Sequence, residues 1–263
     1  MTFKDKTIWI TGASSGIGEA LAYAFAERDA NLVLSGRNKE ALEKVKSNCA
    51  FGSEILVQVL DLEKLDSFEE IVRKATQKMK KIDVLINNAG ITQRALAKDT
   101  QFEVDKKIIT INLLGTIALT KAVLPQMLQR KQGHLVVISS LMGKFASPLR
   151  SSYAASKHGL HGFFDALRAE TFRDNIKITL ICPGFIRTQI SMNALKGDGS
   201  KQNSMDDSTA SGMAPEKLAG KIIRAIEKEK KEITVGGFEI LAVYLKRFFP
   251  GILSRIIRKV KVT

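Results

Sequence analysis

The feature that most constrains the fold is a regular alternation between short apolar runs and longer segments with helical periodicity. Seven apolar runs predict strands near residues 8–10, 32–34, 55–60, 84–86, 135–138, 176–181 and 233–235. Between them, apolar residues recur at three- and four-residue steps near 16–28, 38–48, 64–80, 98–131, 151–173 and 215–230. Strands that alternate with helices form βαβ crossovers. The sequence therefore predicts an α/β fold, a doubly wound parallel sheet covered on both faces.

The spacing of loop-forming residues indicates one main domain. The chain has 263 residues, and no Pro/Gly/Ser-rich linker divides it before about residue 190. We expect a domain over residues 1–236, with a polar loop at about 190–214 that is rich in Ser, Asn, Asp, Gly and Met. Residues 237–263 are expected to form a basic, apolar helical tail.

Cysteine content and hydropathy favour a cytoplasmic protein. Cys49 and Cys182 lie far apart, and Cys182 falls within an apolar run where a buried thiol is usual. The first apolar run starts too close to Met1 to leave room for a signal peptide. We find no uncharged apolar stretch of the roughly 18 residues that a membrane span requires.

The formal net charge of +14 suits a nucleic acid, an anionic membrane surface or an anionic small ligand. Charge alone does not choose among these partners. Aromatic residues make up only 6% of the chain, and no strip of alternating basic and aromatic residues occurs outside the extreme C-terminus. This composition argues against a nucleic-acid partner.

Chemistry-bearing residues follow the predicted strands, at the sheet edge where ligands of such folds bind. Gly12, Gly16 and Gly18 lie between the first strand and its helix. Without Cβ atoms, such residues let the backbone approach a pyrophosphate, and the free N–H groups of the helix bind the phosphates. A plain glycine-rich turn is the alternative. The position in a βαβ unit favours the phosphate loop.

Several motifs together resemble the classical short-chain dehydrogenase/reductase family. They are Thr11-Gly-x-x-x-Gly-x-Gly18, Asn87-Asn-Ala-Gly90, Ser140, Tyr153-x-x-x-Lys157 and Pro183-Gly184, and the match spans about residues 5–236 in the correct order. The resemblance implies a single Rossmann-type domain, a nicotinamide dinucleotide, a small-molecule carbonyl or alcohol substrate, and a homo-dimer or homo-tetramer. It also implies that the polar segment at about 190–214 is the substrate loop. The run 183–207 and the tail are most similar to membrane-associated members that reduce steroid-like or lipid ketones.

The resemblance also assigns the cofactor-binding residues. They are Gly12, Ser14, Ser15, Gly16, Ile17, Gly18, Arg37, Asp61, Leu62, Asn88, Ala89, Gly90, Tyr153, Lys157, Pro183, Gly184, Ile186 and Thr188. In NAD-selective sites an acidic residue after the second strand binds the adenosine ribose. Gly36 occupies that position here, and the guanidinium of Arg37 follows it, so we expect NADP(H) with Arg37 on the 2′-phosphate. The alternative for Arg37 is an ordinary surface charge.

Four residues are expected to carry the chemistry. Tyr153 and Lys157 are one helical turn apart, and a nearby ammonium lowers the pKa of a phenol, which fits Tyr153 for general acid/base work. The family places its substrate-binding serine at Ser140, with Ser139 as the near alternative. Asn112 matches the family asparagine that holds a water linked to the lysine, and a simple buried cap is its alternative.

The histidines give no metal site in this reading. His134, His158 and His161 have no metal-ligand partners in the sequence pattern, and packing or surface roles are expected for them. No metal is therefore predicted.

The tail predicts two short helices separated by Pro250-Gly251. Residues 240–263 carry six basic and no acidic residues. In the second helix, Ile252, Leu253, Ile256, Ile257 and Val260 recur at helical steps, while Arg255, Arg258 and Lys259 lie on other faces. This pattern fits peripheral contact with an anionic membrane. Alternatively, the apolar residues cover the substrate pocket or a subunit interface.

Three functions follow, and the first is preferred. The chain is a carbonyl reductase or alcohol dehydrogenase, a nucleotide-sensing scaffold on the same fold, or a charge-driven binder of nucleic acid or anionic surfaces. A scaffold normally lacks the tyrosine or the lysine of the catalytic pair, and both Tyr153 and Lys157 are present.

Overall fold

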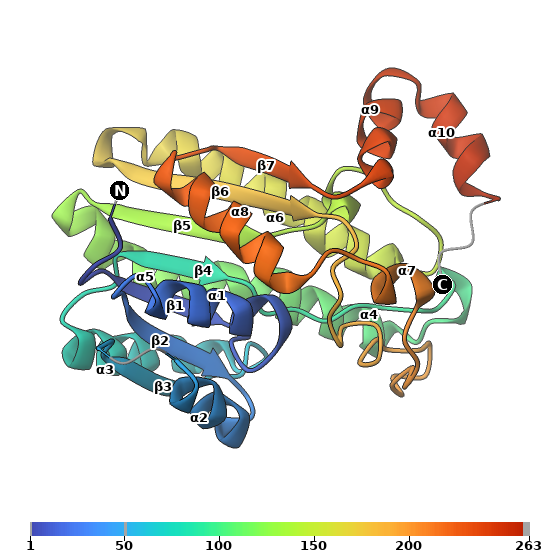
Figure 1. Ribbon diagram of the computed structural model, residues 1–263. Coiled ribbons are helices and arrows are strands. Elements are labelled where there is room, and N and C mark those ends of the chain that lie inside the picture. Colours follow the sequence, from blue (N-terminus) through green and yellow to red (C-terminus); the bar gives the residue numbers. More distant parts are fainter. Residues whose placement is uncertain (1, 50–51, 260–263) are drawn as a thin grey trace.

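A computed structural model describes residues 2–49 and 52–259 (Figure 1). Its centre is one parallel sheet in the order β3-β2-β1-β4-β5-β6-β7. The strands are β1 (Thr7–Thr11), β2 (Asn31–Gly36), β3 (Ile55–Val59), β4 (Val84–Asn87), β5 (Gly133–Ile138), β6 (Ile176–Pro183) and β7 (Glu232–Val235). Each lies within two residues of a predicted apolar run, so the predicted doubly wound α/β sheet is confirmed.

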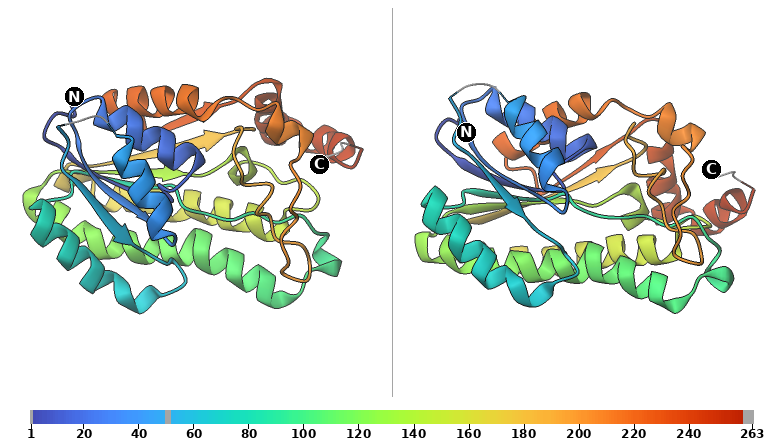
Figure 2. Two further views of the ribbon diagram at one scale, coloured as in Figure 1. Left: turned by 60° about the horizontal axis from the view of Figure 1, so that its bottom comes forward. Right: turned by 90° about the horizontal axis from the view of Figure 1, so that it is seen from below.

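Helices connect the strands and cover both faces of the sheet (Figure 2). They are α1 (Gly16–Ala26), α2 (Lys39–Ser47), α3 (Phe68–Met79), α4 (Phe102–Ile109), α5 (Gly115–Arg130), α6 (Ser151–Glu170), α7 (Asp207–Ala210), α8 (Pro215–Glu227), α9 (Leu241–Phe248) and α10 (Pro250–Ile257). All six predicted helical segments are present. Three of them, 64–80, 98–131 and 151–173, include short 3-10 turns at one end.

Alternate side chains of a strand are buried on opposite faces of the sheet. Ile8 and Ile10 of β1 belong to one core, together with side chains of α1, α2 and α8. Trp9, between them, belongs to the opposite core with side chains of α3, α5 and α6. Successive side chains of a strand point to opposite faces, so a strand buried on both sides must be apolar throughout. This explains why the strands appear in the sequence as unbroken apolar runs.

The strand order also fixes where a ligand can lie. Strand β1 pairs with β2 on one side and with β4 on the other, so the chain changes direction between β1 and β4. In open α/β sheets the ligand crevice lies at the carboxyl ends of the strands beside such a reversal. The loops after β1 and β4 meet there. They contain the predicted glycine loop and Asn87-Asn-Ala-Gly90.

The segment predicted as one helix over 98–131 has a different internal structure. A 3-10 turn at Ala97–Asp99 precedes α4, and a π-helical segment, Thr110–Leu114, joins α4 to α5. The resulting helix, Phe102–Arg130, is long and apolar enough to cross a membrane by length and composition. The sequence count missed it because it required an uncharged stretch, and Lys121 interrupts this one. Leu119, Val123 and Met127 of this helix pack in the core against the sheet, which accounts for its composition.

The tail forms the two helices that Pro250-Gly251 predicts, α9 and α10, and they stand beyond the carboxyl ends of β6 and β7 (Figure 1). Leu253 of α10 is buried against Leu141, Met142 and Phe145, which follow β5. Ile252 and Ile256 of α10 are exposed. One side of the tail therefore packs on the protein, and the other faces outward. Val260, the last apolar residue of the predicted pattern, lies outside the described residues.

Candidate active site

The glycine loop after β1 has the backbone geometry that a phosphate loop requires. Gly12 and Gly16 have φ of +65° and +58°, in the left-handed region that favours glycine. A Cβ on Gly18 would lie 2.2 Å from the carbonyl oxygen of Gly12, so the first turn of α1 sits directly on the loop. The other predicted loop residues are at hand: Ser14 faces Gly36, the exposed Ser15 is the N-cap of α1, and Ile17 packs on the core.

The loop after β4 holds the glycine loop in place. The hydroxyl of Thr11 accepts hydrogen bonds from the backbone N–H groups of Asn88 and Ala89, both at 3.0 Å. The side-chain amide of Asn88 donates to the carbonyl of Thr11 at 2.9 Å. A Cβ on Gly90 would contact Asn112 at 3.1 Å and lie 3.7 Å from the ammonium of Lys157. This loop therefore connects the glycine loop to the residues expected to carry the chemistry.

The ends of β2 and β3 carry the residues expected at the adenosine side. Gly36 ends β2, and a Cβ there would lie 3.5 Å from the hydroxyl of Ser14. Arg37 follows it, is exposed, and forms no ion pair with any residue in the described part of the chain. Asp61 follows β3 and accepts a hydrogen bond from the backbone of Glu63, while Leu62 is buried. The structure leaves the Arg37 guanidinium available to a ligand at this edge.

The turn after β6 closes the opposite side of the crevice. Pro183 ends β6, and the Gly184 N–H donates to the carbonyl of Val235 at 2.7 Å. Ile186 is buried and pairs with Met213 in an isolated bridge. The methyl of Thr188 would lie 2.9 Å from a Cβ on Gly16. Thr188 and the glycine loop, far apart in sequence, therefore face one another.

Tyr153 and Lys157 project from the same face of α6. The Lys157 ammonium is 5.7 Å from the centre of the Tyr153 ring and donates to the carbonyl of Ile138 at 2.8 Å. Burial lowers the pKa of Lys157 to about 8, because the charged ammonium loses hydration; the thiol of Cys182 opposes that shift. The predicted pairing of these two side chains on one helical face is present.

The predicted lowering of the Tyr153 pKa is wrong for this structure. Burial raises the pKa of Tyr153 above its ordinary value, since a phenolate is poorly stabilised in an apolar surround. A hydrogen bond with Ser140 and the charges of Arg150 and Arg94 act in the opposite direction. Both arginines favour the phenolate, but burial outweighs them.

The structure separates the two serines that the sequence offered. Ser140 is half-buried, hydrogen-bonds Tyr153, and accepts from the backbone of Met142 at 3.1 Å. Ser139 is buried, 3.0 Å from Nε2 of His161, and bonded to the carbonyl of Lys157 at 3.4 Å. Ser140 therefore faces the phenol, while the hydroxyl of Ser139 is directed at His161 and the backbone of α6.

Asn112 lies in the π-helical segment and is fully engaged. Its amide accepts from the N–H of Ile91 and donates to the carbonyl of the same residue, both at 2.9 Å, and donates to Ser156 at 3.1 Å. Ser156 in turn donates to the carbonyl of Tyr153 at 2.7 Å. π-Helical turns often occur at functional sites, because they redirect one side chain. Asn112 thus ties the loop after β4 to the helix that carries Tyr153.

The comparisons with known proteins agree with this geometry. A family model described as "short chain dehydrogenase" matches residues 6–199. The chain belongs to the short-chain dehydrogenase family. It is 41% identical over 262 residues to the dehydrogenase/reductase SDR family protein 7-like of Drosophila melanogaster, covering 97% of this chain and 80% of that protein.

Solved structures of other dehydrogenases show the same fold. A short-chain dehydrogenase/reductase from Burkholderia phymatum in complex with NAD has a TM-score of 0.84 at 21% identity, covering 96% of both chains. An alcohol dehydrogenase from Thermococcus sibiricus complexed with 5-hydroxy-NADP has a TM-score of 0.76 at 26% identity, covering 89% of this chain and 97% of that one. This short-chain dehydrogenase is therefore a Rossmann-fold, nucleotide-binding oxidoreductase.

Several residues near the site of this short-chain dehydrogenase escaped the sequence analysis. Arg94, Arg150 and Asp206 form a buried cluster of charges beside Tyr153. Glu239, just before α9, hydrogen-bonds the N–H of Phe185 at 3.3 Å and packs on Gly184. The preceding Gly236 and Gly237 leave room for that carboxylate. No local pattern marks these residues, because their partners lie far away in sequence.

The prediction that His161 has no metal-ligand partner is wrong. Donor atoms of His161, Cys182 and Glu232 all lie within 4.8 Å of one another. Their bonds are nonetheless made within the protein: Glu232 accepts from Lys144 at 2.6 Å, and His161 contacts Ser139. Burial also raises the pKa of Cys182 to about 12, which disfavours the thiolate that a metal needs. We therefore assign no metal to this group. His134 has the packing role expected of it, buried and 2.8 Å from the Thr179 hydroxyl.

The close approach of α1 to the glycine loop predicts the effect of a single methyl group. We expect Gly18→Ala to weaken NADPH and NADH alike by roughly tenfold or more, about 1.4 kcal/mol, since its Cβ would push the loop away from α1. Gly220→Ala in α8 is the control, because nothing lies within 4 Å of its added Cβ. Calorimetric titration of both variants would measure the change. Wild-type affinity in Gly18→Ala would contradict this account of the loop.

Proposed function

We propose that this chain is an NADP(H)-dependent oxidoreductase that interconverts a ketone and a secondary alcohol, with Tyr153 as general acid/base. The observation that carries the proposal is the convergence of three side chains. Ser140 hydrogen-bonds the phenol, and Lys157 lies on the same face of α6 as Tyr153, with its ammonium 5.7 Å from the ring. A scaffold that only binds nucleotide has no need of this arrangement.

Each of these side chains has a role in the proposed reduction. Negative charge develops on the carbonyl oxygen as the carbon is reduced, and Tyr153 donates its proton to that oxygen. Ser140 donates a hydrogen bond to the same oxygen and stabilises the charge. Lys157 then passes a proton to the Tyr153 phenolate and regains one from water. Asn112 with Ser156 holds Tyr153 and Lys157 in register on α6. In oxidation, the same groups act in reverse.

The crevice fits a nicotinamide dinucleotide, because its loop is packed too tightly for a side chain at Gly12 or Gly18. A Cβ at either position would collide with neighbouring backbone atoms. We propose that this cofactor is held by the predicted residues: the loop over residues 12–18, Asp61 and Leu62, Asn88 to Gly90, Tyr153 and Lys157, and the turn containing Pro183, Gly184, Ile186 and Thr188. Bound there, the reduced nicotinamide supplies the hydride. The exposed guanidinium of Arg37, beside Gly36 in place of an acid, supports NADP(H) over NAD(H).

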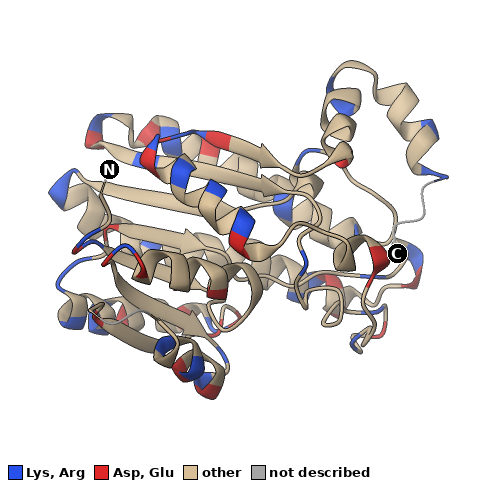
Figure 3. Cartoon of the chain, in the orientation of Figure 1, with Lys and Arg blue, Asp and Glu red and all other residues tan. Residues whose placement is uncertain are grey.

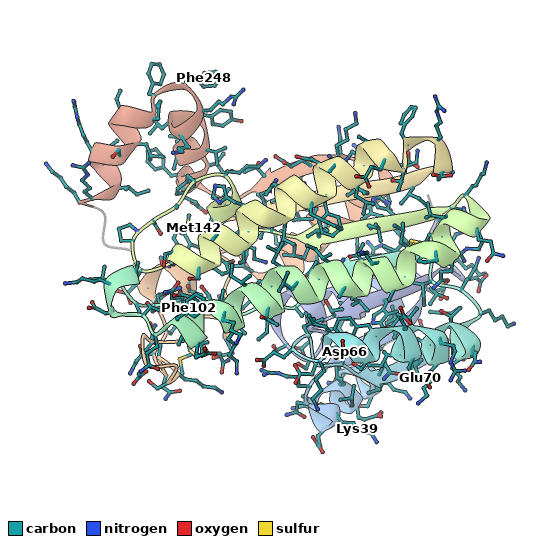
Figure 4. All side chains as sticks on the ribbon, turned by 180° about the vertical axis from the view of Figure 1, so that it is seen from behind. Lys39, Asp66, Glu70, Phe102, Met142 and Phe248 are labelled. Carbon is teal, nitrogen blue, oxygen red and sulfur yellow. The ribbon has the colours of Figure 1, made fainter. Side chains whose placement is uncertain are left out.

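A lipophilic substrate is supported by the surroundings of Tyr153. Its ring packs in an apolar cluster with Leu141, Met142 and Phe145, and Leu253 from α10 completes that cluster. Figure 4 shows Met142 on the loop below the tail, between the body of the protein and α10. The tail therefore adds apolar surface beside the proposed reaction site. We propose that the enzyme acts on ketones or alcohols of lipid-like character and assembles as a homo-dimer or homo-tetramer.

We also propose that this enzyme is cytoplasmic and makes peripheral contact with an anionic membrane, which the outward side of the tail supports. Phe248 is 67% exposed and lies at the outer end of α9 (Figure 4). Phe249, Ile252 and Ile256 are exposed near it. The region 241–259 carries five basic and no acidic residues, and Figure 3 shows blue but no red on α9 and α10. Each cation near an anionic leaflet contributes roughly 1 kcal/mol to binding.

Tyr153→Phe removes the phenol hydroxyl, the proposed proton donor, and keeps the ring. We expect kcat on a verified ketone to fall by roughly 10²- to 10⁴-fold, with NADPH affinity largely unchanged. Tyr244→Phe, on the exposed side of α9, is the matched control and is expected to keep wild-type turnover. Steady-state kinetics and NADPH titration give both quantities. If Tyr153→Phe kept most of its kcat, Tyr153 would not be the acid/base.

Arg37→Ala tests the cofactor preference. We expect NADPH binding to weaken by about 1.5–3 kcal/mol, the range for a hydrogen bond to a charged group, while NADH binding changes little. Arg173→Ala, an exposed arginine before β6 at the other end of the sheet, is the control. Equal losses for both cofactors, or a wild-type preference for NADH, would overturn the NADP(H) proposal.

The membrane proposal is tested by two exposed phenylalanines. Phe248→Ser/Phe249→Ser should reduce co-sedimentation with anionic vesicles by roughly tenfold or more, because two apolar side chains no longer enter the interface. Phe172→Ser, which changes an even more exposed phenylalanine on the 3-10 turn before β6, is the control and should bind as the wild type does. Wild-type binding should weaken with added salt. No binding by the wild type, or binding that neither salt nor the double substitution changes, would exclude the membrane surface.

A further inference from the structure

Three charged side chains form a buried cluster beside the proposed reaction site, here called the Arg94–Asp206–Arg150 cluster. Nε of Arg94 donates to the carboxylate of Asp206 at 2.9 Å, and its Nη2 donates to the same oxygen. Arg150 Nη2 lies 3.7 Å from that oxygen. The three side chains are 6%, 1% and 7% exposed. Charges this deeply buried are retained only where they are paired.

The cluster joins three segments that are far apart in the chain. Arg94 lies on the loop after β4, and Arg150 is the N-cap residue of α6, three positions before Tyr153. Asp206 is the N-cap residue of α7, within the segment between β6 and α8 that is expected to contain the substrate loop. The cluster therefore fastens this loop to the two elements that flank the phenol.

Further contacts hold the loop at the same place. The Arg94 N–H donates to the carbonyl of Leu195 at 2.8 Å, and the Leu195 N–H donates to Thr92 at 2.9 Å. On the other side, Gln202 donates to the second oxygen of Asp206 at 2.8 Å. In Figure 2 the segment between β6 and α8 runs down beside the strand ends. Asp206 is the one carboxylate in this set of contacts. It accepts hydrogen bonds from Arg94, outside the loop, and from Gln202, within the loop.

The charges of the cluster affect the pKa of Tyr153. Two arginines and one aspartate sum to a single positive charge. Burial raises the pKa of Asp206, but hydrogen bonds from Arg94 and Gln202 and the charges of both arginines outweigh it and keep the pKa below its ordinary value. The same arginines lower the pKa of Tyr153 against the effect of burial. Arg150 also lies over the ring of Phe185, with its Cζ 5.9 Å from the centre.

We propose that Asp206 is a positioning residue: it latches the substrate loop over the reaction site and holds Arg94 and Arg150 where their charge acts on Tyr153. The inference rests on the proposed function of Tyr153. The other ionisable groups near the phenol are Lys157 on its own helix and the Cys182 thiol of β6, which shares its apolar cluster. Neither contacts the loop through an ion pair, so the cluster is the link between loop and phenol.

The loop is tested with Asp206→Asn, which keeps the shape and removes the charge. Its matched control is Asp207→Asn, the exposed neighbour. We expect amide hydrogen exchange over residues 191–206 to accelerate at least tenfold in Asp206→Asn, because two buried guanidinium groups lose their counter-ion. KM for a ketone should rise by a similar factor, while NADPH affinity stays at the wild-type value. Asp207→Asn should match the wild type in every measurement.

Two further variants separate the latch from a general loss of folding. Arg94→Met/Asp206→Asn removes the pair together, and its hydrogen exchange should lie closer to the wild type than that of Asp206→Asn. Arg150→Met should shift the pH profile of alcohol oxidation to higher pH by about one unit, since Tyr153 loses a cation that favours its phenolate. A purely structural role for Arg150 would leave that profile in place.

The outcomes separate the latch from the proposed function. If the wild-type chain oxidised or reduced no alcohol or ketone, the proposed function would fail, and hydrogen exchange alone would decide the latch. If Asp206→Asn exchanged and turned over like Asp207→Asn, or if Arg150→Met left the pH profile unchanged, the latch proposal would be overturned.

Discussion

The proposed site depends on the burial of an ammonium and a phenol side by side. Lys157 is buried with a single described hydrogen bond, to the carbonyl of Ile138, and burial lowers its pKa to about 8. Burial acts on Tyr153 in the opposite sense and raises its pKa. Both shifts disfavour charge, as expected of groups that lose hydration. The phenol therefore keeps its proton at neutral pH, although nearby groups partly offset the effect of burial.

The offsetting groups come from different parts of the chain. Ser140 is positioned by the end of β5, Arg150 by the start of α6, and Arg94 by the loop after β4. Asp206 on the loop between β6 and α8 then pairs with both arginines. The acidity of Tyr153 is thus linked to the placement of the loop that is expected to cover a substrate. The linkage depends on the topology of the doubly wound sheet, because the strand order brings these four segments to the same edge.

The sequence predicted most of what depends on local pattern. Strands buried on both faces need unbroken apolar runs, so β1 and β6 could be predicted from the sequence. The break between α9 and α10 could also be predicted, because Pro250 cannot continue a helix. The glycine loop followed from the need for close backbone approach at Gly12 and Gly18. Resemblance to the family supplied Ser140 and Asn112, which no spacing argument distinguishes from other serines and asparagines.

Features that depend on distant partners were not predictable in this way. Arg94 and Asp206 are 112 residues apart, and neither stands in a recognisable motif. The meeting of His161, Cys182 and Glu232 depends on which strands adjoin α6. The lower pKa expected for Tyr153 rested on Lys157 alone and left out burial, which acts more strongly in the folded chain. The π-helical segment around Asn112 likewise reflects its bonds to Ile91 and Ser156, which are tertiary contacts.

The central claim, that Tyr153 is a protonated donor whose acidity the surrounding charges set, can be measured without a substrate. The chain has three tyrosines, so labelling their ring Cζ with carbon-13 gives a short spectrum that Tyr153→Phe assigns. Titration by nuclear magnetic resonance should show the Tyr153 phenol protonated at pH 7, with a pKa above the ordinary value of about 10. A phenolate at pH 7 in the free chain, or a pKa well below 10, would contradict the account.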